Sequence, residues 1–457
     1  MKKYDAIIIG AGQAGVPLAK KLANAGKKVA IIEKKWIGGT CINDGCSPTK
    51  TMIASARVAH LTKNGKQWGV ETDKITINYK TIIARKDEII ESFRGGATKG
   101  LKNAPNLEII FGDASFINNH QILIKSADKE TEIEGELIFI NTGCTPIIPD
   151  IDGIKETKYL TSTTLLELDE IPKHLIIVGG GYISLELGQM MRRFGAKVTI
   201  LEREKTLMPK EDDDVCEVIT EVFKNEGIEI HTNAEVKYIS GKQQKKVTAN
   251  IKGKQQTFTG SHILIAIGRM PQTETLKLAL AGVETDEKGY IKVDEKLKTT
   301  AKNIYALGDV KGGPAFTQIA YNDFVIVSKN ILEKGDLTTS GRPIPYCMFT
   351  DPQLGRVGLS ETQAKEQGIK YKVAKLPMKH VARALETGET TGYMKAIVDP
   401  DSKKILGVAV VGTEGGEIMS VLQIAMLGNI TYEQIRYNIF AHPLYAESLN
   451  NLFMSFD

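Results

Sequence analysis

The chain has 457 residues, 25% of them charged, and a formal net charge of +4, so it is long enough for two to four domains around a sizeable buried core. Hydrophobic residues make up 42%, which is ordinary for a globular protein. Because no block of Lys and Arg dominates and no run of about eighteen apolar residues occurs, we expect neither a nucleic-acid partner nor a membrane span.

Near its N-terminus the chain predicts a dinucleotide-binding turn. Residues 4–9 form a continuous apolar run typical of a buried strand, and Gly10, Gly12 and Gly15 follow at the start of a helical pattern. A second predicted strand ends at Glu33. The glycines would let a pyrophosphate approach the N-terminus of the helix, and Glu33 would accept a hydrogen bond from a ribose hydroxyl.

Two cysteines, Cys41 and Cys46, follow this turn in a chain that has five cysteines in all. Along a regular helix their Cα atoms would lie roughly 7.5 Å apart, more than the roughly 6.8 Å that a disulfide tolerates. The backbone must therefore bend for them to meet, and Gly45 can permit the bend. Such sparing use of cysteine indicates a cytoplasmic protein in which this pair performs redox chemistry rather than stapling the fold.

The segment after the cysteines predicts a mixture of helices and strands, and a tight Gly-x-x-Pro turn that begins at Gly143. The predicted elements are helices over 50–61 and 79–101 and strands over 107–111, 121–125 and 137–140.

The layout of strand, glycine turn, helix and acid-ended strand then occurs a second time, with Gly179 and Gly181 in the turn and Glu202 at the strand end. The two glycine turns begin 169 positions apart, whereas the two Gly-x-x-Pro turns, at Gly143 and Gly268, begin 125 positions apart. The first copy is therefore longer, and the cysteine segment lies within its extra length. This repeat predicts two nucleotide-binding domains, one of which carries a redox insert.

The nucleotide preference of the second copy depends on charge. Glu202 would accept a ribose 2′-hydroxyl and repel a 2′-phosphate, which favours NADH. Arg203 and Lys205 follow at once and could bind that phosphate, so NADPH stays possible. Ser184 stands where a third glycine is usual, and it is small enough for the helix to pack on the strand.

An acidic run, Glu211-Asp212-Asp213-Asp214, precedes a further helical pattern. Because the helix dipole favours negative charge at a helix N-terminus, we expect a solvated first turn there. We expect no metal site in the chain.

The cysteine segment closely resembles the redox-active motif of the FAD-dependent pyridine nucleotide-disulfide oxidoreductases of class I. Asp44, Ser47 and Asn141 depart from the family's commoner residues, and an inward-pointing Asp44 carboxylate would raise the pKa of the thiols. The agreement covers essentially the whole chain. The stretch 38–43, together with 381–385 and Gly388, looks closer to mercuric reductases and their relatives than to glutathione reductase. The matching residues are Gly38-Gly39-Thr40-Cys41, Asn43, Gly45-Cys46, Pro48, Lys50, and the stretches 142–146, 303–309, 345–352 and 442–447.

The resemblance implies an α/β fold with two Rossmann-like nucleotide-binding domains plus a C-terminal α+β dimerisation domain. It places a discontinuous FAD-binding domain that carries the redox disulfide at 1–148 and 270–338. It places the NAD(P)-binding domain at 149–269 and the dimerisation domain at 339–457. The expected assembly is a homodimer.

The resemblance also implies roles for individual residues. Cys46 would face the flavin and Cys41 would attack the substrate, while Lys50, paired with Glu186, would steady charge on the ring. His442, oriented by Glu447 on a last helical segment, would move the exchange proton, and a histidine titrates in the range that this step needs. The expected FAD contacts are Gly10, Gly12, Gly15, Glu33, Gly39, Thr40, Lys50, Ala114, Thr142, Gly143, Asp309 and Gln318, and the expected NAD(P)H contacts are Gly179, Gly181, Tyr182, Ile183, Glu202 and Gly268.

The substrate is left open by the sequence. We favour a mercuric-reductase-like NAD(P)H oxidoreductase that acts on a small-molecule disulfide, a dithiol or a thiol-bound soft metal ion. Mercury(II) enzymes typically carry a C-terminal cysteine pair, whereas the last cysteine here is Cys347. Dihydrolipoamide dehydrogenase is the first alternative, and a flavin-bearing redox sensor with little turnover is the second.

Overall fold

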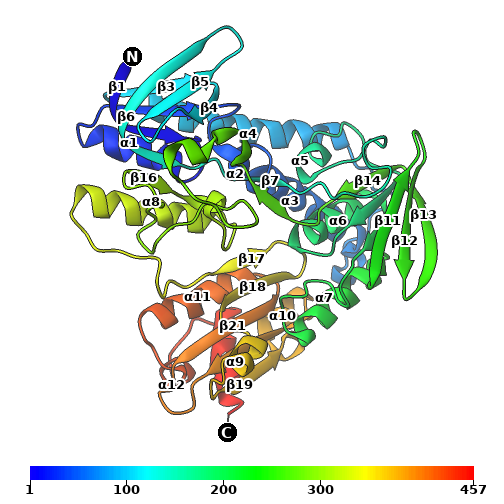
Figure 1. Cartoon of the computed structure of the whole chain (residues 1–457). Coiled ribbons are helices and arrows are strands. Elements are labelled where there is room, and N and C mark those ends of the chain that lie inside the picture. The colour runs from blue at the N-terminus through cyan, green and yellow to red at the C-terminus, as the bar shows by residue number, and fades with distance from the viewer. Residues whose placement is uncertain (457) are drawn as a thin grey trace. The chain divides into compact units, whose positions relative to one another are not determined.

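The computed structural model describes residues 1–456, which divide into two compact units (Figure 1). Each unit gathers segments that are distant in the sequence. The first consists of Met1–Thr51, Thr81–Ile147 and Gly268–Arg342, and the second consists of Met52–Lys80, Ile148–Ile267 and residues 343–456. The predicted division into three domains stays a prediction.

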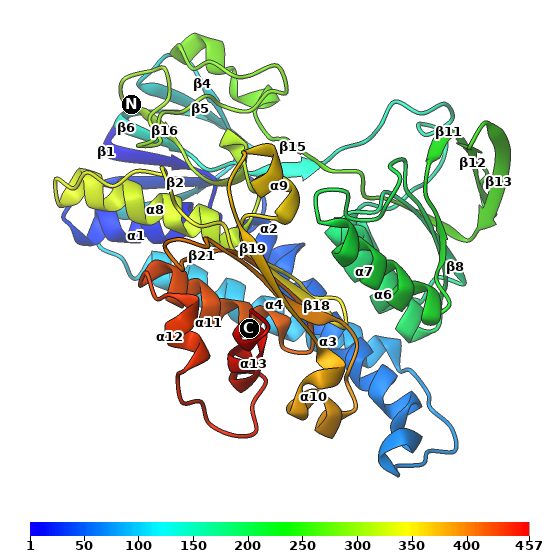
Figure 2. The same ribbon diagram turned by 90° about the horizontal axis from the view of Figure 1, so that it is seen from below.

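The first unit is built on a sheet in the order β3-β2-β1-β6-β5-β4, with β16 paired to β6. Strand β1 is apolar on both faces: Ile7 and Ile9 pack into one core cluster, and Ala6 and Ile8 into another, as expected of a strand covered on both sides. Helices α1 and α8 lie side by side along the sheet (Figure 2). The elements are β1 Lys2–Ile9, α1 Gly15–Asn24, β2 Val29–Glu33, α2 Gly39–Asn43, β3 Leu107–Phe111, β4 Asp113–Phe116, β5 Gln121–Lys125, β6 Glu130–Ile140, β7 Cys144–Pro146, β15 Arg269–Pro271, β16 Ile304–Ala306 and α8 Thr317–Leu332.

The second unit repeats this plan in a parallel sheet of order β10-β9-β8-β14, which corresponds strand for strand to β3-β2-β1-β6. An antiparallel sheet, β11-β12-β13, completes this region. The elements are α5 Ser162–Leu165, β8 His174–Val178, α6 Tyr182–Phe194, β9 Lys197–Leu201, α7 Asp213–Asn225, β10 Glu229–His231, β11 Ala234–Ser240, β12 Lys245–Ile251, β13 Lys254–Gly260 and β14 His262–Ile265.

The C-terminal part of the second unit is an antiparallel sheet of order β17-β18-β21-β20-β19 with helices packed against it. Its elements are β17 Tyr346–Met348, β18 Gln353–Gly358, α9 Glu361–Glu366, β19 Lys372–Pro377, α10 Ala382–Thr387, β20 Tyr393–Val398, β21 Ile405–Gly412, α11 Gly415–Leu427, α12 Tyr432–Arg436 and α13 Leu449–Met454. Each of two long helices, α3 Cys46–Lys63 and α4 Tyr79–Lys102, has residues in both units. The boundary between the units falls after Thr51 in α3 and after Lys80 in α4.

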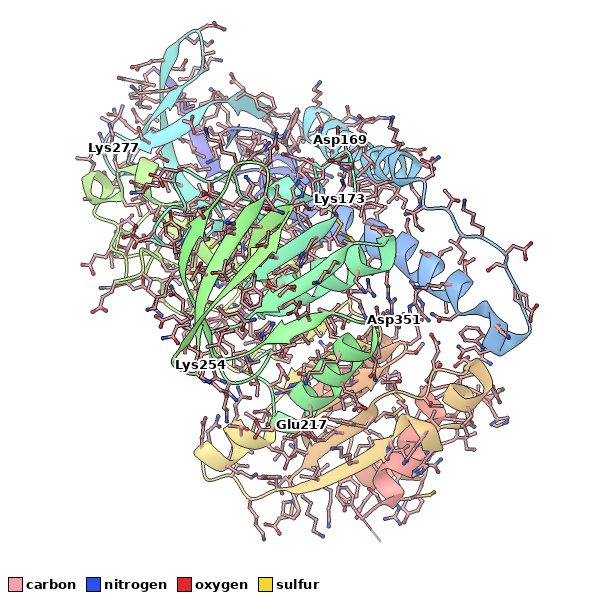
Figure 3. All side chains as sticks on the ribbon, turned by 90° about the vertical axis from the view of Figure 1, so that its right-hand side faces the viewer. Asp169, Lys173, Glu217, Lys254, Lys277 and Asp351 are labelled. Carbon is pink, nitrogen blue, oxygen red and sulfur yellow. The ribbon has the colours of Figure 1, made fainter. Side chains whose placement is uncertain are left out.

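Charged side chains hold α3 within the second unit. Arg57 of α3 forms ion pairs with Asp351 at 2.6 Å and with Glu389 at 2.5 Å. Asp351, which is labelled in Figure 3, also pairs with Arg193 of α6 at 2.8 Å, and Arg193 continues to Glu226 at 2.7 Å. Because Arg193 is almost completely buried, its ion pairs with Asp351 and Glu226 are desolvated. Removing one partner of such a pair would leave a buried charge uncompensated.

Most predicted strands and helices are confirmed, including both strand-turn-helix units. One predicted helix is wrong: the segment from His442 to Tyr445 is a bend, and a short 3₁₀ turn begins at Ala446. The antiparallel strands β11–β13 were not among the predicted elements.

The prediction of a solvated acidic turn before α7 is confirmed for Asp213, which is exposed, but is wrong for Glu211 and Asp212, which are buried. Asp212 is 7% exposed, and Lys395 of β20, itself buried, lies 2.9 Å from Asp212, 2.8 Å from Asp214 and 3.0 Å from Glu361. Burial alone would raise the pKa of Asp212, but hydrogen bonds from Lys395 and from the amides of Thr362 and Glu361 lower it below its ordinary value. A basic partner 183 positions away in the sequence accounts for this burial.

We expect Lys395→Met to lower the free energy of unfolding by about 3–5 kcal/mol at pH 7, because it leaves buried carboxylates without their counter-charge. Denaturant unfolding followed by circular dichroism measures this change. Because the pKa of Asp212 is lowered on folding, the network stabilises the wild type above the unfolded-state pKa of Asp212. We expect that contribution to be lost as the pH falls below about 4.

Lys375→Met is the matched control, since Lys375 also pairs with Asp214 but its side chain is 42% exposed. It should cost less than about 1 kcal/mol. Equal costs for the two variants would contradict the importance of the buried network.

Candidate active site

The first glycine turn is closed by a carboxylate from the neighbouring strand. Glu33, at the end of β2, accepts hydrogen bonds from the amides of Ala11 at 2.9 Å and Lys35 at 2.8 Å. Gly10 has a φ of +103°, and a Cβ there would lie 2.3 Å from the carbonyl oxygen of Asn141. A Cβ on Gly15 would lie 2.1 Å from the carbonyl oxygen of Gly10. Side chains are therefore excluded from this turn, and the bare backbone at the start of α1 fits a dinucleotide pyrophosphate.

The cysteine segment is built directly onto this turn. The amide of Gly38 donates to the carbonyl of Ala11 at 2.8 Å, and a Cβ on Gly39 would lie 2.8 Å from the Cα of Gly12. Thr40 and Cys41 follow on the short helix α2. The predicted redox residues are thus placed beside the predicted FAD turn within one unit.

The bend between the cysteines is present. Helix α2 ends at Asn43, Asp44 has a non-helical backbone, and α3 begins at Cys46. Gly45 does not need a left-handed conformation here. It needs space, since a Cβ on Gly45 would lie 2.9 Å from the carbonyl oxygen of Thr40.

Asn43 and Arg94 stabilise this bend through side-chain hydrogen bonds. The Asn43 side-chain amide donates to the carbonyls of Gly39 at 2.8 Å and Ile37 at 3.1 Å. Arg94 of α4 donates from Nε to Asn43 Oδ1 at 2.7 Å, and its guanidinium stacks over the ring of Trp36 at 4.2 Å. Arg94 was missed in the sequence because helix α4 carries no motif.

The two thiols influence each other strongly. A hydrogen bond with Cys46 and burial raise the pKa of Cys41 above its usual range, and a hydrogen bond with Thr317 and the charge of Lys50 offset part of that rise. Cys41 is half-buried and Cys46 is exposed. Because the two thiols interact this strongly, they titrate as a unit, and their ionisation belongs to the pair rather than to either cysteine.

Thr317 is a further site residue that sequence reasoning missed. Its Oγ1 lies 3.5 Å from Cys46 Sγ, and Thr317 is the first residue of α8. Both the hydroxyl and the helix N-terminus stabilise a thiolate. The neighbouring residue, Gln318, was predicted as a cofactor contact, so the sequence pattern indicated this part of the chain but not Thr317 itself.

The predicted FAD residue Asp309 lies on a separate turn of the first unit. Burial raises the pKa of Asp309, and Arg269 and Lys311 offset part of the rise. The preceding amide, that of Gly308, donates to Asp323 Oδ2 at 2.8 Å. Asp323 is fully buried and pairs with Lys311 and Arg342, so this turn is held by a desolvated charge cluster.

The second glycine turn repeats the closure of the first. Glu202 accepts hydrogen bonds from the amide of Gly180 and, at 2.8 Å, from that of Glu204. The hydroxyl of Ser184, which replaces the third glycine, donates to the carbonyl of Ala266 at 3.2 Å. Within residues 1–456 a Cβ on Gly181 would meet open space, which suits the approach of a ligand to the N-terminus of α6.

The predicted acid–base pair lies in the second unit. His442 Nδ1 is 3.0 Å from Glu447 Oε2, and the side chains are 73% and 19% exposed respectively. The carboxylate thus fixes one ring nitrogen and leaves Nε2 facing outward. Glu186, buried in the same unit, accepts a hydrogen bond from the Phe349 amide at 2.8 Å, and its pairing with Lys50 of the first unit stays a prediction.

The remaining predicted residues divide between the units. Ala114 is buried on β4, Thr142 donates to the carbonyl of Gln272 at 2.8 Å, and Gly143 has a φ of +69°. The first unit holds Gly10, Gly12, Gly15, Glu33, Gly39, Thr40, Cys41, Cys46, Lys50, Ala114, Thr142, Gly143, Gly268, Asp309 and Gln318, and the second holds Gly179, Gly181, Tyr182, Ile183, Glu186, Glu202, His442 and Glu447.

The described residues contain neither a group of side chains suited to a metal ion nor a helix suited to crossing a membrane. Across residues 1–456, no three or more His, Cys, Asp or Glu side chains are grouped so that they could hold a metal ion. In the same residues no helix combines the length and the apolar character needed to cross a membrane.

Comparison with protein families finds two matches that span most of the chain. Residues 4–323 match the pyridine nucleotide-disulphide oxidoreductase model, and residues 344–453 match the dimerisation domain of the same family. The dimerisation match supports a homodimer.

Individual proteins show the same similarity. The chain is 40% identical to RclA of Escherichia coli (strain K12), described as a probable pyridine nucleotide-disulfide oxidoreductase, over 99% of both chains. It is 33% identical to a mercuric reductase of Lysinibacillus sphaericus, over 99% of this chain and 83% of that one. A solved structure described as the Cu(II) complex of the HOCl-induced flavoprotein disulfide reductase RclA from Escherichia coli superimposes with a TM-score of 0.92 at 39% identity, covering 100% of both chains.

We expect Thr317→Val to slow alkylation of Cys46 by iodoacetamide at pH 7 by about 3- to 10-fold in the reduced protein, because the thiolate loses a hydrogen-bond donor. Mass spectrometry of the modified peptides measures the rate at each cysteine. Thr317→Ser keeps the hydroxyl and should react like the wild type. Equal rates for Val and Ser would show that the hydroxyl does not stabilise the thiolate.

Proposed function

Because this chain belongs to the pyridine nucleotide-disulphide oxidoreductase family, we propose that it carries electrons from NADH, through FAD and the Cys41–Cys46 pair, to a small-molecule disulfide, a dithiol or a thiol-bound soft metal ion. The observation that carries this proposal is the cysteine pair at the α2–α3 bend, held against the first glycine turn. The predicted family, fold class and flavoenzyme class are confirmed. The roles of individual residues are part of the proposal.

The first unit supplies residues that fit FAD. The glycine turn at Gly10–Gly15 offers amides to a pyrophosphate, and Glu33 keeps acceptor capacity for a ribose hydroxyl. Asp309 lies on a turn held by Asp323 and would receive hydrogen bonds from the ribityl chain. Bound FAD would take up a hydride from the nicotinamide and pass an electron pair to the disulfide.

The chain's own residues then control the thiols. In the reduced pair the Thr317 hydroxyl, 3.5 Å from Cys46 Sγ, would stabilise a thiolate on Cys46, and Cys41 would give up its proton when it attacks the substrate. Lys50 would stabilise the charge that develops nearby, and its predicted partner Glu186 would steady Lys50. Tyr182, at the start of α6, adjoins the second glycine turn and would admit the nicotinamide.

Proton transfer falls to His442. Its Nδ1 is anchored by Glu447, so the exposed Nε2 is the atom that gives and takes the proton during thiol–disulfide exchange. In the homodimer, His442 of one protomer would serve the cysteine pair of the other.

The histidine dyad also favours a second candidate, dihydrolipoamide dehydrogenase. Oxidation of a dithiol needs a base, and His442 held by Glu447 supplies one. Turnover of metal ions places less demand on such a base, and the similarity to a reductase solved as its Cu(II) complex keeps soft metals among the candidate substrates.

Steady-state kinetics with lipoamide, glutathione disulfide, Hg(II) and Cu(II), each with NADH and NADPH, test the proposal. We expect turnover of at least one of these acceptors and a kcat/KM for NADH at least about 10-fold above that for NADPH, because the Glu202 carboxylate repels a 2′-phosphate.

Glu202→Gln keeps an acceptor for the Gly180 amide but removes the charge, so it should narrow the NADH preference. A wild type that prefers NADPH would contradict the nucleotide assignment. Absence of turnover with every acceptor, although NADH reduces the flavin, would contradict the proposed enzyme activity.

His442→Gln should lower kcat with a disulfide substrate by about 10²- to 10⁴-fold, because the exchange proton loses its carrier. Stopped-flow reduction of the bound flavin by NADH should keep its wild-type rate. His380→Gln, an exposed histidine of the same sequence region, is the control and should be unaffected. Loss of flavin reduction in His442→Gln would contradict its assignment to the thiol step.

A further inference from the structure

The carboxamide of Asn141 lies between the first glycine turn and the turn that carries Asp309. Asn141 follows the last residue of β6 and is 8% exposed. Its Oδ1 accepts a hydrogen bond from the amide of Gly15 at 2.9 Å, and its Nδ2 donates to the carbonyl of Leu307 at 2.9 Å. A single side chain therefore bonds to both turns.

The orientation of this amide is determined by its partners. Gly15 presents an N–H group and Leu307 presents a carbonyl, so the oxygen of Asn141 must face the first turn and the nitrogen the second. An aspartate could accept from Gly15 but could not donate to Leu307. An alanine could do neither.

Glycines on both turns pack against the same amide. A Cβ on Gly12 would lie 2.9 Å from Asn141 Oδ1, and a Cβ on Gly308 would lie 2.9 Å from Asn141 Nδ2. The backbone of both turns thus approaches as closely as the carboxamide permits. The spacing of the two turns follows from the size of this side chain.

Each turn has a further anchor on its far side. Glu33 closes the first turn through the Ala11 amide, and Asp323 holds the second through the Gly308 amide. The backbone amide of Asn141 also donates to the carbonyl of Ile9 at 2.7 Å, which ties the residue to the end of β1. The strands that lead into the two turns, β1 and β16, both pair with β6, and the amide of Leu307 donates to the carbonyl of Ile140 at 2.9 Å. The sheet thus aligns the strands, and Asn141 adds a side-chain link between the turns themselves.

We propose that Asn141 is a positioning residue that sets the distance between the first glycine turn, Gly10–Gly15, and the turn that carries Asp309. That distance determines how tightly the chain binds FAD. This inference rests on the proposed placement of FAD across these turns. Asn141 acts through the backbone of Gly15 and Leu307, and the two turns would contact the cofactor.

The test compares FAD with ADP, which occupies the first turn alone. We expect Asn141→Ala to raise the dissociation constant of FAD, measured by flavin fluorescence on the apoprotein, by at least about 10-fold, because two buried hydrogen bonds are lost. The dissociation constant of ADP, measured by calorimetry, should rise at least about 5-fold less than that of FAD. Asn141→Asp should weaken FAD further, because it adds a negative charge beside the pyrophosphate.

Gln189→Ala is the matched control. Gln189 is a buried amide of the second unit, 3% exposed, that donates to Glu226 at 2.8 Å and to the carbonyl of Asp351 at 2.8 Å. It should lower the melting temperature of the apoprotein without changing the affinity for FAD. If Asn141→Ala does not fold, Asn141→Ser, whose hydroxyl can satisfy one of the two turns, is measured in the same way.

The outcomes are distinguishable. Equal losses of FAD and ADP affinity in Asn141→Ala, or no loss of either, would overturn the positioning role while FAD binding by the wild type still supports the proposed function. Failure of the wild type to bind FAD would overturn the proposed function itself, and this inference with it.

Discussion

The closure of a glycine turn by a carboxylate on the next strand is the interaction on which the structure depends. Glu33 binds the amides of Ala11 and Lys35, and Glu202 binds those of Gly180 and Glu204, in the same two positions relative to each turn. Hydrogen bonds from two backbone amides to a charged acceptor are stronger than bonds between neutral groups. The sequence repeat therefore repeats one physical constraint, the closure of a turn by two amide-to-carboxylate hydrogen bonds. In both turns this closure leaves a backbone that a nucleotide could approach.

The redox segment uses the first of these turns as its foundation. The backbone at Gly39 packs against Gly12, and the backbone at Gly45 packs against Thr40. These two backbone contacts restrict the cysteine segment to a position fixed by the glycine turn. Thr317 reaches Cys46 from the opposite side, at the beginning of α8. A thiolate placed this way is stabilised by fixed dipoles, which need no reorganisation when the charge forms.

Features that depend on neighbouring residues could be predicted from the sequence, and those that depend on distant partners could not. The strands around Gly10 and Gly179 follow from apolar runs and glycine spacing, and the bend near Gly45 follows from the geometry of a helix. The acidic run at Asp212 was misread because its counter-charge, Lys395, lies far along the chain. Thr317 was not predicted for the same reason. Its hydroxyl lies beside Cys46 only because the fold brings together two residues that are 271 positions apart.

His442, the proposed proton carrier, lies on a surface that the single chain leaves uncovered. His442 is 73% exposed, and the apolar side chains of Tyr437, Ile439 and Leu444 around it in sequence are 73%, 93% and 48% exposed. Exposed apolar groups at such density mark an interaction surface, and this segment lies in the region that matches the family's dimerisation domain. Glu447, only 19% exposed, fixes the imidazole before any partner arrives. The pair of His442 and Glu447 is thus preorganised within one protomer. If the proposed role of His442 holds, a second protomer covering this surface would exclude water from it, and thiol exchange would then need the homodimer.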